Sequence, residues 1–496
     1  MSVQIVPVTY APDLDNAWSV APGALVSVTN FVPLQNGTYG SCGWTDLGWT
    51  ITGSDQVSAY LIRKVDGTVR CFVNRATNID EYDYAGTRTN RATGLTSTAD
   101  WSMCAQGNAV IACSIDNATQ VSTGAGFAAL GGGSPKAAHC ASNRGFVMLA
   151  NTDTSGDQVW WSALYNYASF TPSIATEAGN TRLLEAPGPI TALIAYRDGF
   201  VAFKDNALFV AEYVGPNYIW DWRIMSNRIG CVGDKAVVEC DGKLYFMHRS
   251  GFYEFDGANL RNIGLPLFNA FLSWFGHITI PGYGTFNQTS IALSKVQTAA
   301  DEIEGTVTFK HSYVYTLTGK YFDAYYTYNV RSQKWGYVSG NGSGDTNQIL
   351  VRASAADFDD FKGSHLSARF LMIQTVSAAT TLQYAKYPAV TTNAGAAFTT
   401  GVIGSPDSSG TLYRFHWRTL AGTDNDTGVT ITANTYSSEN RNLSLGTITG
   451  SVNTEMDYGD ILTSSRFRRI NLTWQNGKAV VLGGVGLELK KAGSPR

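Results

Sequence analysis

Short apolar runs alternate with turn pairs throughout residues 199–256, and this alternation constrains the fold more than any other feature of the sequence. The runs are three or four residues long and rich in aromatic and β-branched side chains. They end at pairs such as Asp241-Gly242 and Ser250-Gly251, which is typical of β-strands joined by tight turns. Because every strand of such a meander must bury one face, the pattern predicts a stack of several small sheets.

The unit recurs along the chain. Gly-Phe-Val begins at Gly145 and again at Gly199, 54 residues later, and another Gly-Phe pair begins at Gly251, after a further 52 residues. A period near 50 residues that holds about four short strands matches one blade of a β-propeller. We therefore expect an all-β protein built on a propeller of about six blades, since roughly 40–50 residues per blade gives six or seven. A large irregular β-sandwich is the alternative.

The amino-acid composition indicates what kind of surface this chain presents. Only 15% of the 496 residues are charged, 51 are Gly, and the formal net charge is −3. Soluble proteins usually contain about 25% charged residues, so this surface suggests a chain that is covered by neighbours or works outside the cytosol in an assembly. A net charge this close to zero excludes an extended basic surface for binding nucleic acid.

The cysteines predict buried free thiols in a reducing cytosol, because they are widely spaced, odd in number and without a Cys-x-x-Cys pair. The residues after Met1 show neither a basic segment nor an apolar core, so we expect no signal peptide. No apolar run reaches about 18 residues, so we expect no membrane span. We also expect no metal ion and no cofactor. The seven cysteines are Cys42, Cys71, Cys104, Cys113, Cys140, Cys231 and Cys240.

Changes in amino-acid composition and in the pattern of strands and turns divide the chain into three segments. Residues 1–40 are turn-rich and predict an extended N-terminal segment that packs on the C-terminal domain. Residues 41–345 hold the repeated strand and turn units of the propeller. From residue 346 to 496, Ala, Thr and Ser dominate, and the strand candidates are typical of a β-sandwich-like docking domain. The best helix candidate is 268–275, where aromatic and aliphatic residues recur at helical spacing.

Two aromatic motifs have a structural and a functional interpretation. Residues 151–163 resemble the aspartate-box turn of sialidase-type propellers at approximate spacing, and they equally predict a plain β-turn over a buried Trp. Trp220 and Trp222 flank Asp221 and therefore point to the same face of a strand. Two indoles there would fill a gap between blades, so we expect core residues and not a ligand platform.

The other candidate motifs predict no catalytic or ligand-binding role. The triple glycine at 131–133 lacks the Lys-Ser/Thr of a phosphate-binding loop, and the acidic pair at 301–302 lies on a predicted exposed loop. Arg466, Arg468 and Arg469 could contact phosphates or the carboxylates of a partner, but a solvated strand face is the simpler interpretation. We identify no catalytic, cofactor-binding, metal-binding or DNA-channel residue, and we expect that the protein is not an enzyme.

Several motifs occur in an order that resembles a known family. In that order they look like the propeller of the tail nozzle, or tail hub, proteins of short-tailed bacteriophages, including the packaged-DNA-stabilisation type. Residues 11–15, 30–33 and 481–490 resemble the two ends of the same proteins. The ordered propeller motifs are Val159–Ser162, Gly199–Lys204, Gly215–Trp222, Ile229–Gly233, Asp241–Phe246 and Ser250–Gly257.

The resemblance implies a structural virion protein that is made in the host cytoplasm and located in the virion tail. Its copies would form a homohexameric nozzle ring, the DNA-exit channel, which retains the packaged DNA and passes it during ejection. It further implies contacts with the head-to-tail adaptor ring, tail fibres or spikes, and a tail plug or needle. Packaged duplex DNA would pass through without sequence readout, and weak net charge suits such passage because each phosphate contact would add friction.

A glycan-binding or glycan-cleaving propeller is the alternative function. Its support is the turn at 151–163 and the aromatic content of 12%. Such a protein would be active as a monomer and would retain sugar, whereas a nozzle protein would assemble on its adaptor.

Overall fold

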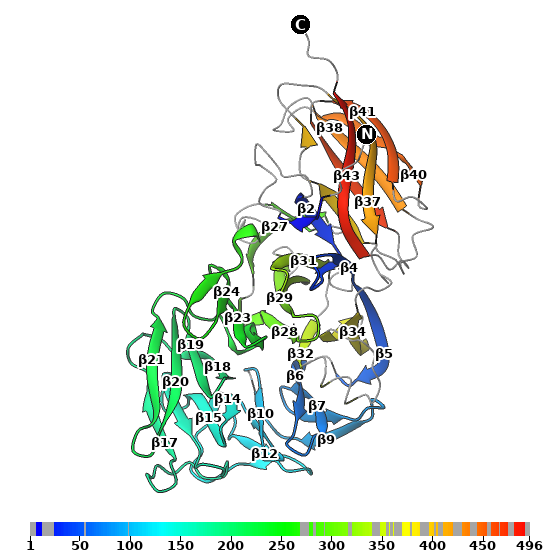
Figure 1. Cartoon of the computed structure of the whole chain (residues 1–496). Coiled ribbons are helices and arrows are strands. Elements are labelled where there is room, and N and C mark those ends of the chain that lie inside the picture. Colours follow the sequence, from blue (N-terminus) through cyan, green and yellow to red (C-terminus); the bar gives the residue numbers. More distant parts are fainter. Residues whose placement is uncertain are drawn as a thin grey trace.

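The computed structural model is nearly all β and has two parts, a propeller in the lower part of Figure 1 and a β-sandwich at its upper end. The molecule is elongated along the line that joins them. The structure describes residues 6–11, 24–53, 56–97, 99–267, 277–280, 284–291, 293–315, 320–339, 348–353, 357, 361, 370–376, 379–386, 396–400, 403–404, 410–419, 429–436, 444–453, 458–465, 467–474 and 481–491.

The described strands of the propeller form seven four-stranded antiparallel blades. Their inner strands contact one another in order around a ring, and the last contacts the first. From the inner to the outer strand, the first three blades are β6 (Gln56–Arg63), β7 (Val69–Arg75), β8 (Ile79–Tyr82) and β9 (Arg88–Ala92); β10 (Ser102–Gln106), β11 (Ala109–Cys113), β12 (Gln120–Ser122) and β13 (Ala128–Ala129); β14 (Ala137–Asn143), β15 (Phe146–Thr152), β16 (Gln158–Trp161) and β17 (Gly179–Arg182).

Blades 4 to 6 continue this pattern, with short 3-10 turns in the connections. These elements are β18 (Ile190–Tyr196), β19 (Gly199–Lys204), β20 (Ala207–Gly215) and β21 (Ile219–Ser226); η2 (Asp234–Ala236); β22 (Val237–Cys240), β23 (Lys243–His248), β24 (Gly251–Phe255) and β25 (Leu260–Asn262); η3 (Leu265–Leu267) and η4 (Leu293–Lys295); β28 (Gln297–Asp301), β29 (Thr306–Tyr315), β30 (Lys320–Asn329) and β31 (Lys334–Ser339). A hairpin of β26 (His277–Ile280) and β27 (Gly284–Ile291) pairs with the end of β29.

The seventh blade is assembled from both ends of the propeller segment. Its inner strands are β32 (Gln348–Arg352), β33 (Phe370–Val376) and β34 (Ala379–Lys386), and its outer strand is the N-terminal β5 (Gly43–Ile51). β5 and β34 pair antiparallel and lie side by side in Figure 1. β32 also pairs in parallel with β6 of blade 1. Strands that are far apart in the sequence therefore close the ring.

The predicted fold class, an all-β propeller with an additional sandwich, is confirmed, but two details differ. The described strands form seven blades where about six were expected. Strands β32 to β34 belong to the propeller, although its boundary was predicted at residue 345. Both differences have one cause: the fourth strand of this blade comes from the N-terminal part of the chain, so no continuous stretch of sequence contains the whole blade. The predicted helix at 268–275 lies outside the described residues.

The sandwich consists of two packed sheets. The N-terminal segment forms part of it, because β2 (Ala24–Thr29) pairs with β35 (Ala397–Thr400) and β4 (Tyr39–Ser41) pairs with β43 (Val481–Lys491). The first sheet has the order β1 (Thr9–Tyr10), β2 (Ala24–Thr29), β35 (Ala397–Thr400), β42 (Phe467–Trp474), β38 (Val429–Tyr436), β39 (Ser444–Thr449), with β36 (Ile403–Gly404) on β42. The second has the order β3 (Phe31–Pro33), β4 (Tyr39–Ser41), β43 (Val481–Lys491), β37 (Gly410–Thr419), β41 (Tyr458–Ser465), β40 (Ser451–Asn453).

One continuous sheet joins the propeller to the sandwich. β31, the outer strand of blade 6, pairs with β3 at Phe31↔Tyr337, and β4 pairs with β43 at Tyr39↔Leu482. A single cluster of buried apolar side chains extends from blades 4 to 6 into the sandwich. The two parts therefore share a sheet and a core, which is a stiffer connection than a linker.

Buried polar groups fix the same junction. The Asn30 side-chain oxygen accepts hydrogen bonds from the Ser339 backbone N–H at 3.0 Å and its hydroxyl at 2.8 Å. The Tyr39 hydroxyl donates to the Trp335 carbonyl at 2.9 Å. Because these groups are buried, losing either partner would leave a polar atom without compensation.

Close backbone contact between blades 4 and 5 makes one glycine position testable. A Cβ atom at Gly230 would lie 1.8 Å from the Lys204 carbonyl oxygen, whereas Gly233 has an extended φ of 174° and no atom within 4 Å of such a Cβ. We expect Gly230→Ala to lower the free energy of unfolding by about 2–3 kcal/mol. Gly233→Ala is the control and should shift it by less than about 1 kcal/mol. Urea unfolding measures both, and equal losses would contradict the predicted clash.

Candidate functional site

Polar and charged side chains from three blades meet at the propeller axis. His139 lies on β14, Asp234 on η2 before blade 5, and Arg352 on β32 of blade 7. The Asp234 carboxylate lies 3.4 Å from His139 Nδ1 and 3.7 Å from Arg352 Nη1, and the Leu193 backbone N–H donates to it at 3.4 Å. Because blades 3, 5 and 7 are not neighbours, these groups can meet only at the centre of the ring. We call His139, Asp234 and Arg352 the axial cluster.

Groups of the protein itself engage the cations at the axis. Arg352 also donates to the Asp234 carbonyl at 3.0 Å. Lys235 donates to the Val57 carbonyl at 2.6 Å, and its ammonium lies 2.9 Å from the Asp100 carboxylate. Burial lowers the pKa of Lys235, and the Asp100 charge opposes that shift. This pattern is typical of a structural ion cluster that ties blades together.

Turns on one face of the propeller are hydrogen-bonded from blade to blade. Asn143 in blade 3 donates its side-chain N–H groups to the carbonyls of Arg197 at 2.8 Å and Gly199 at 2.7 Å in blade 4. Tyr196 in blade 4 donates its hydroxyl to the Gly242 carbonyl of blade 5 at 2.9 Å. These bonds fix the relative position of neighbouring blades.

A polar hollow of about 380 Å³ lies beside these turns, and its two arginines already have partners. The Arg144 guanidinium lies 4.9 Å from the centre of the Tyr213 ring, and that of Arg197 lies 5.0 Å from the centre of the Tyr196 ring. Arg197 also donates to the Asp256 carbonyl at 2.5 Å. Stacking and hydrogen bonding within the fold therefore account for both cations.

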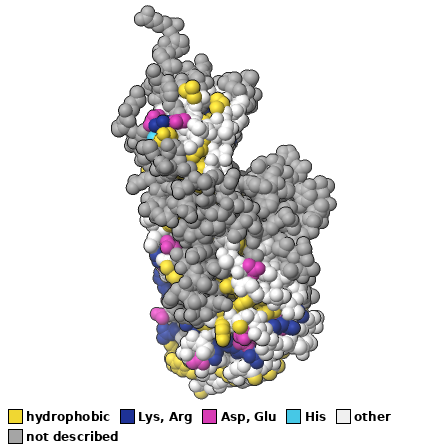
Figure 2. Space-filling model, turned by 90° about the vertical axis from the view of Figure 1, so that its right-hand side faces the viewer, with side chains coloured by type: hydrophobic (Ala, Val, Ile, Leu, Met, Phe, Trp, Pro, Cys, Tyr) yellow, Lys and Arg dark blue, Asp and Glu magenta, His cyan; other side chains and the backbone are white. Residues whose placement is uncertain are grey.

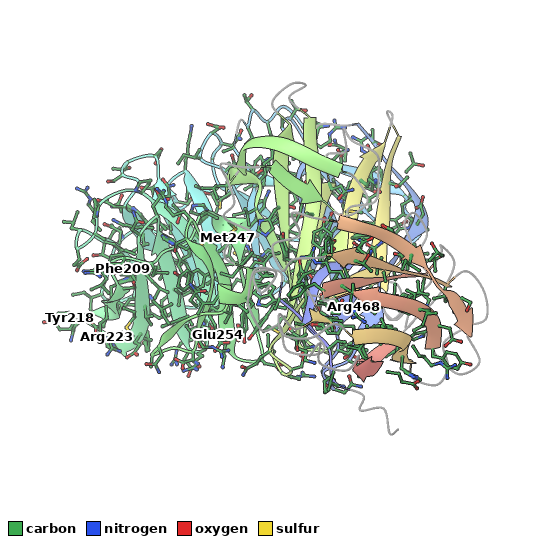
Figure 3. All side chains as sticks on the ribbon, turned by 90° about the horizontal axis from the view of Figure 1, so that it is seen from above. Phe209, Tyr218, Arg223, Met247, Glu254 and Arg468 are labelled. Carbon is green, nitrogen blue, oxygen red and sulfur yellow. The ribbon has the colours of Figure 1, made fainter. Side chains whose placement is uncertain are left out.

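A second hollow lies between the outer parts of blades 3 and 4, and we call it the rim groove. It has a volume of about 650 Å³ and is lined by Trp161 and Gly179 on one side and by Tyr218, Ile219 and Trp220 on the other. Trp161 and Trp220 are buried, but Tyr218 is 82% exposed. Figure 3 shows Tyr218 at the edge of the propeller that lies farthest from the sandwich.

Trp220 is a core residue, as the sequence predicted. Its ring makes edge contacts with Phe146 of blade 3 at 5.4 Å and with Phe200 of its own blade at 5.1 Å, measured between ring centroids. Trp222 is only partly buried. Trp220 therefore fills the gap between the two blades, while one part of it also borders the rim groove.

The loop that carries Tyr218 has an unusual backbone. Asn217 has a φ of 91° and Ile219 a φ of 59°. Asn tolerates such positive φ values, but β-branched residues very rarely adopt them. Such strain, of order 1–3 kcal/mol, persists only where the surroundings impose it, and it is concentrated at binding sites.

The turn at 151–163 is structural. The Asp157 carboxylate accepts hydrogen bonds from Arg182 Nε at 2.8 Å and Nη2 at 2.9 Å, and from the Ser155 hydroxyl at 2.7 Å. Trp161 lies buried at its end and donates its indole N–H to the Glu177 carbonyl at 2.8 Å. The plain β-turn over a buried Trp is therefore confirmed.

The expectation of a solvated arginine face in the sandwich is wrong for the residues that the structure describes. Arg468 is only 2% exposed and donates to the Ser465 carbonyl at 2.6 Å, and Arg469 is partly buried. Burial lowers the pKa of both. The cause is the position of β42, which is an interior strand of its sheet. Figure 3 shows Arg468 within the sandwich. Arg466 lies outside the described residues.

Two other sequence candidates also have structural roles. Asp301 is buried and accepts the backbone N–H groups of Ile303 at 3.1 Å and Glu304 at 3.4 Å, so it caps its own turn. A Cβ at Gly132 would lie 1.8 Å from the Ala168 carbonyl oxygen, so this glycine permits close backbone contact.

The seven cysteines are free thiols, and all but the partly exposed Cys104 are buried. Among the described residues, no group of three or more His, Cys, Asp and Glu side chains is arranged to hold a metal ion. A search of the same residues finds no helix of the length and hydropathy needed to cross a membrane.

Comparisons with known proteins give no family. No protein-family model matches the chain, and no curated protein matches it. Among solved structures, a chain from a Saccharomyces cerevisiae complex of Dbp5 with Nup159 and Gle1 is 9% identical, with a TM-score of 0.37, and covers 70% of this chain and 95% of its own length.

Two bacterial structures show a similar level of likeness. A virginiamycin B lyase from Staphylococcus aureus is 9% identical, with a TM-score of 0.27 over 70% of this chain and 99% of its own. A gluconolactonase from Xanthomonas campestris is 10% identical, with a TM-score of 0.32 over 59% of this chain and 95% of its own. Likeness this low assigns neither a family nor an activity.

The ion pair in the 151–163 turn predicts a measurable pH dependence. The Arg182 guanidinium lowers the pKa of Asp157 to about 2, while an unfolded chain has an Asp pKa of about 3.9. A depressed carboxyl pKa stabilises the fold above the unfolded value, and that contribution is lost as pH falls from about 4 to 2. Asp157→Asn should therefore be less stable than the parent chain at pH 7, with the difference vanishing near pH 2.

Urea unfolding between pH 2 and pH 7 measures this difference. Asp153→Asn is the matched control, because Asp153 is an exposed carboxylate in the same turn and no such loss is expected for it. An Asp157→Asn difference that stays constant with pH would show that the ion pair does not stabilise the turn.

Proposed function

We propose that this chain is a structural protein of a short-tailed bacteriophage, forming the distal nozzle ring of the tail through which DNA leaves. The order of the sequence motifs in residues 159–257 supports the proposal. These motifs lie in blades 3 to 5, on strands β16, β19, β21, β23 and β24 and in their connections. Of the motif glycines, Gly199 and Gly230 allow close backbone contact, since a Cβ atom there would lie 2.0 Å from the Ala211 carbonyl oxygen and 1.8 Å from the Lys204 carbonyl oxygen.

The observation that carries the proposal is the continuous sheet from blade 6 into the sandwich. A nozzle must hold its shape while a pressurised genome is retained and then released, so its parts need a stiff connection. Here the propeller and the sandwich share backbone pairing at β31–β3 and β4–β43 and one buried core. A chain built this way can dock through the sandwich and hold its propeller at a fixed distance.

The axial cluster bears on the path that we propose for the DNA. The axial cluster occupies the centre of the ring of blades, so in the proposed assembly the channel lies between copies of the chain and not through one propeller. On the face shown in Figure 2, basic and acidic side chains both occur at the propeller end. Together with the net charge of −3, this suits a wall along which duplex DNA slides.

The proposed partners are further copies in a closed, hexameric ring, the head-to-tail adaptor ring, tail fibres or spikes, and a plug or needle. Contacts that close by rotation are the usual way to build such rings. We propose a non-catalytic role in the virion, because the charged groups at the axis are engaged by the fold itself.

Sedimentation velocity of the purified chain, alone and mixed with the portal–adaptor complex, tests the proposal. We expect the chain to remain a monomer alone and to join the adaptor complex in a closed ring, which cryo-electron microscopy would then resolve. The same mixture without the adaptor ring is the control. A chain that stays monomeric with every tail component would overturn the nozzle function.

A further inference from the structure

We propose that the rim groove between blades 3 and 4 is a binding site for a neutral saccharide. The inference does not rest on the nozzle function, because the groove lies within one chain. It stands on three observations: the chemistry of the groove walls, the exposed ring of Tyr218, and the fixed position of the buried rings.

The walls of the groove combine aromatic rings with uncharged polar groups. Among the described residues that line it, none is charged. Hydroxyl groups come from Ser173 and Thr181, and amide groups come from Asn180 and Asn217. A saccharide offers C–H faces for aromatic rings and hydroxyls for such donors and acceptors. An anionic ligand would lose hydration here without gaining a cationic partner.

Tyr218 provides the open aromatic surface. The residue is 82% exposed, and Ile174, which also lines the groove, is 68% exposed. The loop holds Tyr218 between Asn217 and Ile219, both at positive φ. What distinguishes Tyr218 from other exposed tyrosines is its place on the wall of the groove, where a ligand could contact its ring together with Trp161 and Trp220.

The other two rings are held in place before any ligand arrives. The Trp161 indole donates to the Glu177 carbonyl at 2.8 Å and packs against Gly179, where a Cβ would lie 2.7 Å from the ring. Trp220 is wedged between Phe146 and Phe200. Side chains that are ordered in the free protein lose less entropy on binding, so a ligand that contacts them binds more tightly.

The volume and chemistry of the groove favour a saccharide over other occupants. About 650 Å³ lies within the range of small-molecule sites, so two or three sugar rings are an appropriate size. A proline-rich peptide also binds aromatic grooves, but four amide and hydroxyl side chains match the many hydroxyls of a sugar better. Cleavage of a glycosidic bond usually needs two carboxyl groups, and the described lining residues supply none, so the proposal is for binding alone.

The test uses the full-length chain on an array of neutral, sialylated and uronic-acid oligosaccharides, with a proline-rich peptide included. We expect retention on neutral glycans only. The best neutral glycan is then titrated while tryptophan fluorescence is recorded, because Trp161 and Trp220 border the groove. Tyr218→Ala should weaken binding at least about tenfold, whereas Tyr218→Phe, which keeps the ring, should stay within about threefold of the parent chain.

Tyr165→Ala is the matched control. Tyr165 is an exposed tyrosine of blade 3, 80% exposed and at a positive φ of 55°, and it does not line the groove. Its affinity should stay within about twofold of the parent chain. The proposal is overturned if no neutral glycan is retained, if only anionic glycans or the peptide bind, or if Tyr165→Ala weakens binding as much as Tyr218→Ala. Urea unfolding of each variant verifies that the fold is intact.

Discussion

A propeller blade is stable only when both of its faces are covered, and the rest of this structure depends on that constraint. Between neighbouring blades, these faces are covered by large aromatic side chains. Trp220, which packs between Phe146 and Phe200, is an example. The first and last blades obtain neighbours only if the ring closes. Closure by β5 and β34 has a second effect: the chain enters and leaves the propeller at the same blade. Residues 24–41 and 396–491 can therefore combine in one sandwich.

The sequence predicts the parts of the fold that are local. Blades 3 to 5 can be recognised from the Gly-Phe pairs at the starts of β15, β19 and β24 and from the Asp241-Gly242 turn, because tight turns and buried strands need those residues at those positions. The seventh blade could not be predicted in this way, since its strands come from residues 43–51 and 348–386 and no repeat joins them. The buried state of Arg468 was missed for a related reason: the pattern of one strand does not show that it lies inside a sheet.

The candidate sites divide in the same way, into those that a local sequence pattern predicts and those that depend on residues far apart in the sequence. Trp220 was predicted as core because its spacing from Trp222 is a local property of a strand. The axial cluster was missed, since His139, Asp234 and Arg352 lie far apart in the sequence and carry no shared spacing. The rim groove had one usable signal, the Gly215-Pro216-Asn217-Tyr218 turn, which places an aromatic residue at a loop tip. Nothing in the sequence indicates that the 173–181 loop of blade 3 lies opposite it.

Ring closure also determines the order in which the chain can fold. During synthesis β5 emerges early, but the strand that pairs with it, β34, is not complete until residue 386. Until then β5 has no partner in its blade and presents an open edge, which is the kind of surface that promotes association of nascent chains. Contacts between such distant segments also slow folding, because a long loop must close before any pairing stabilises it. On these grounds, closure of the seventh blade is expected to be a late step in folding.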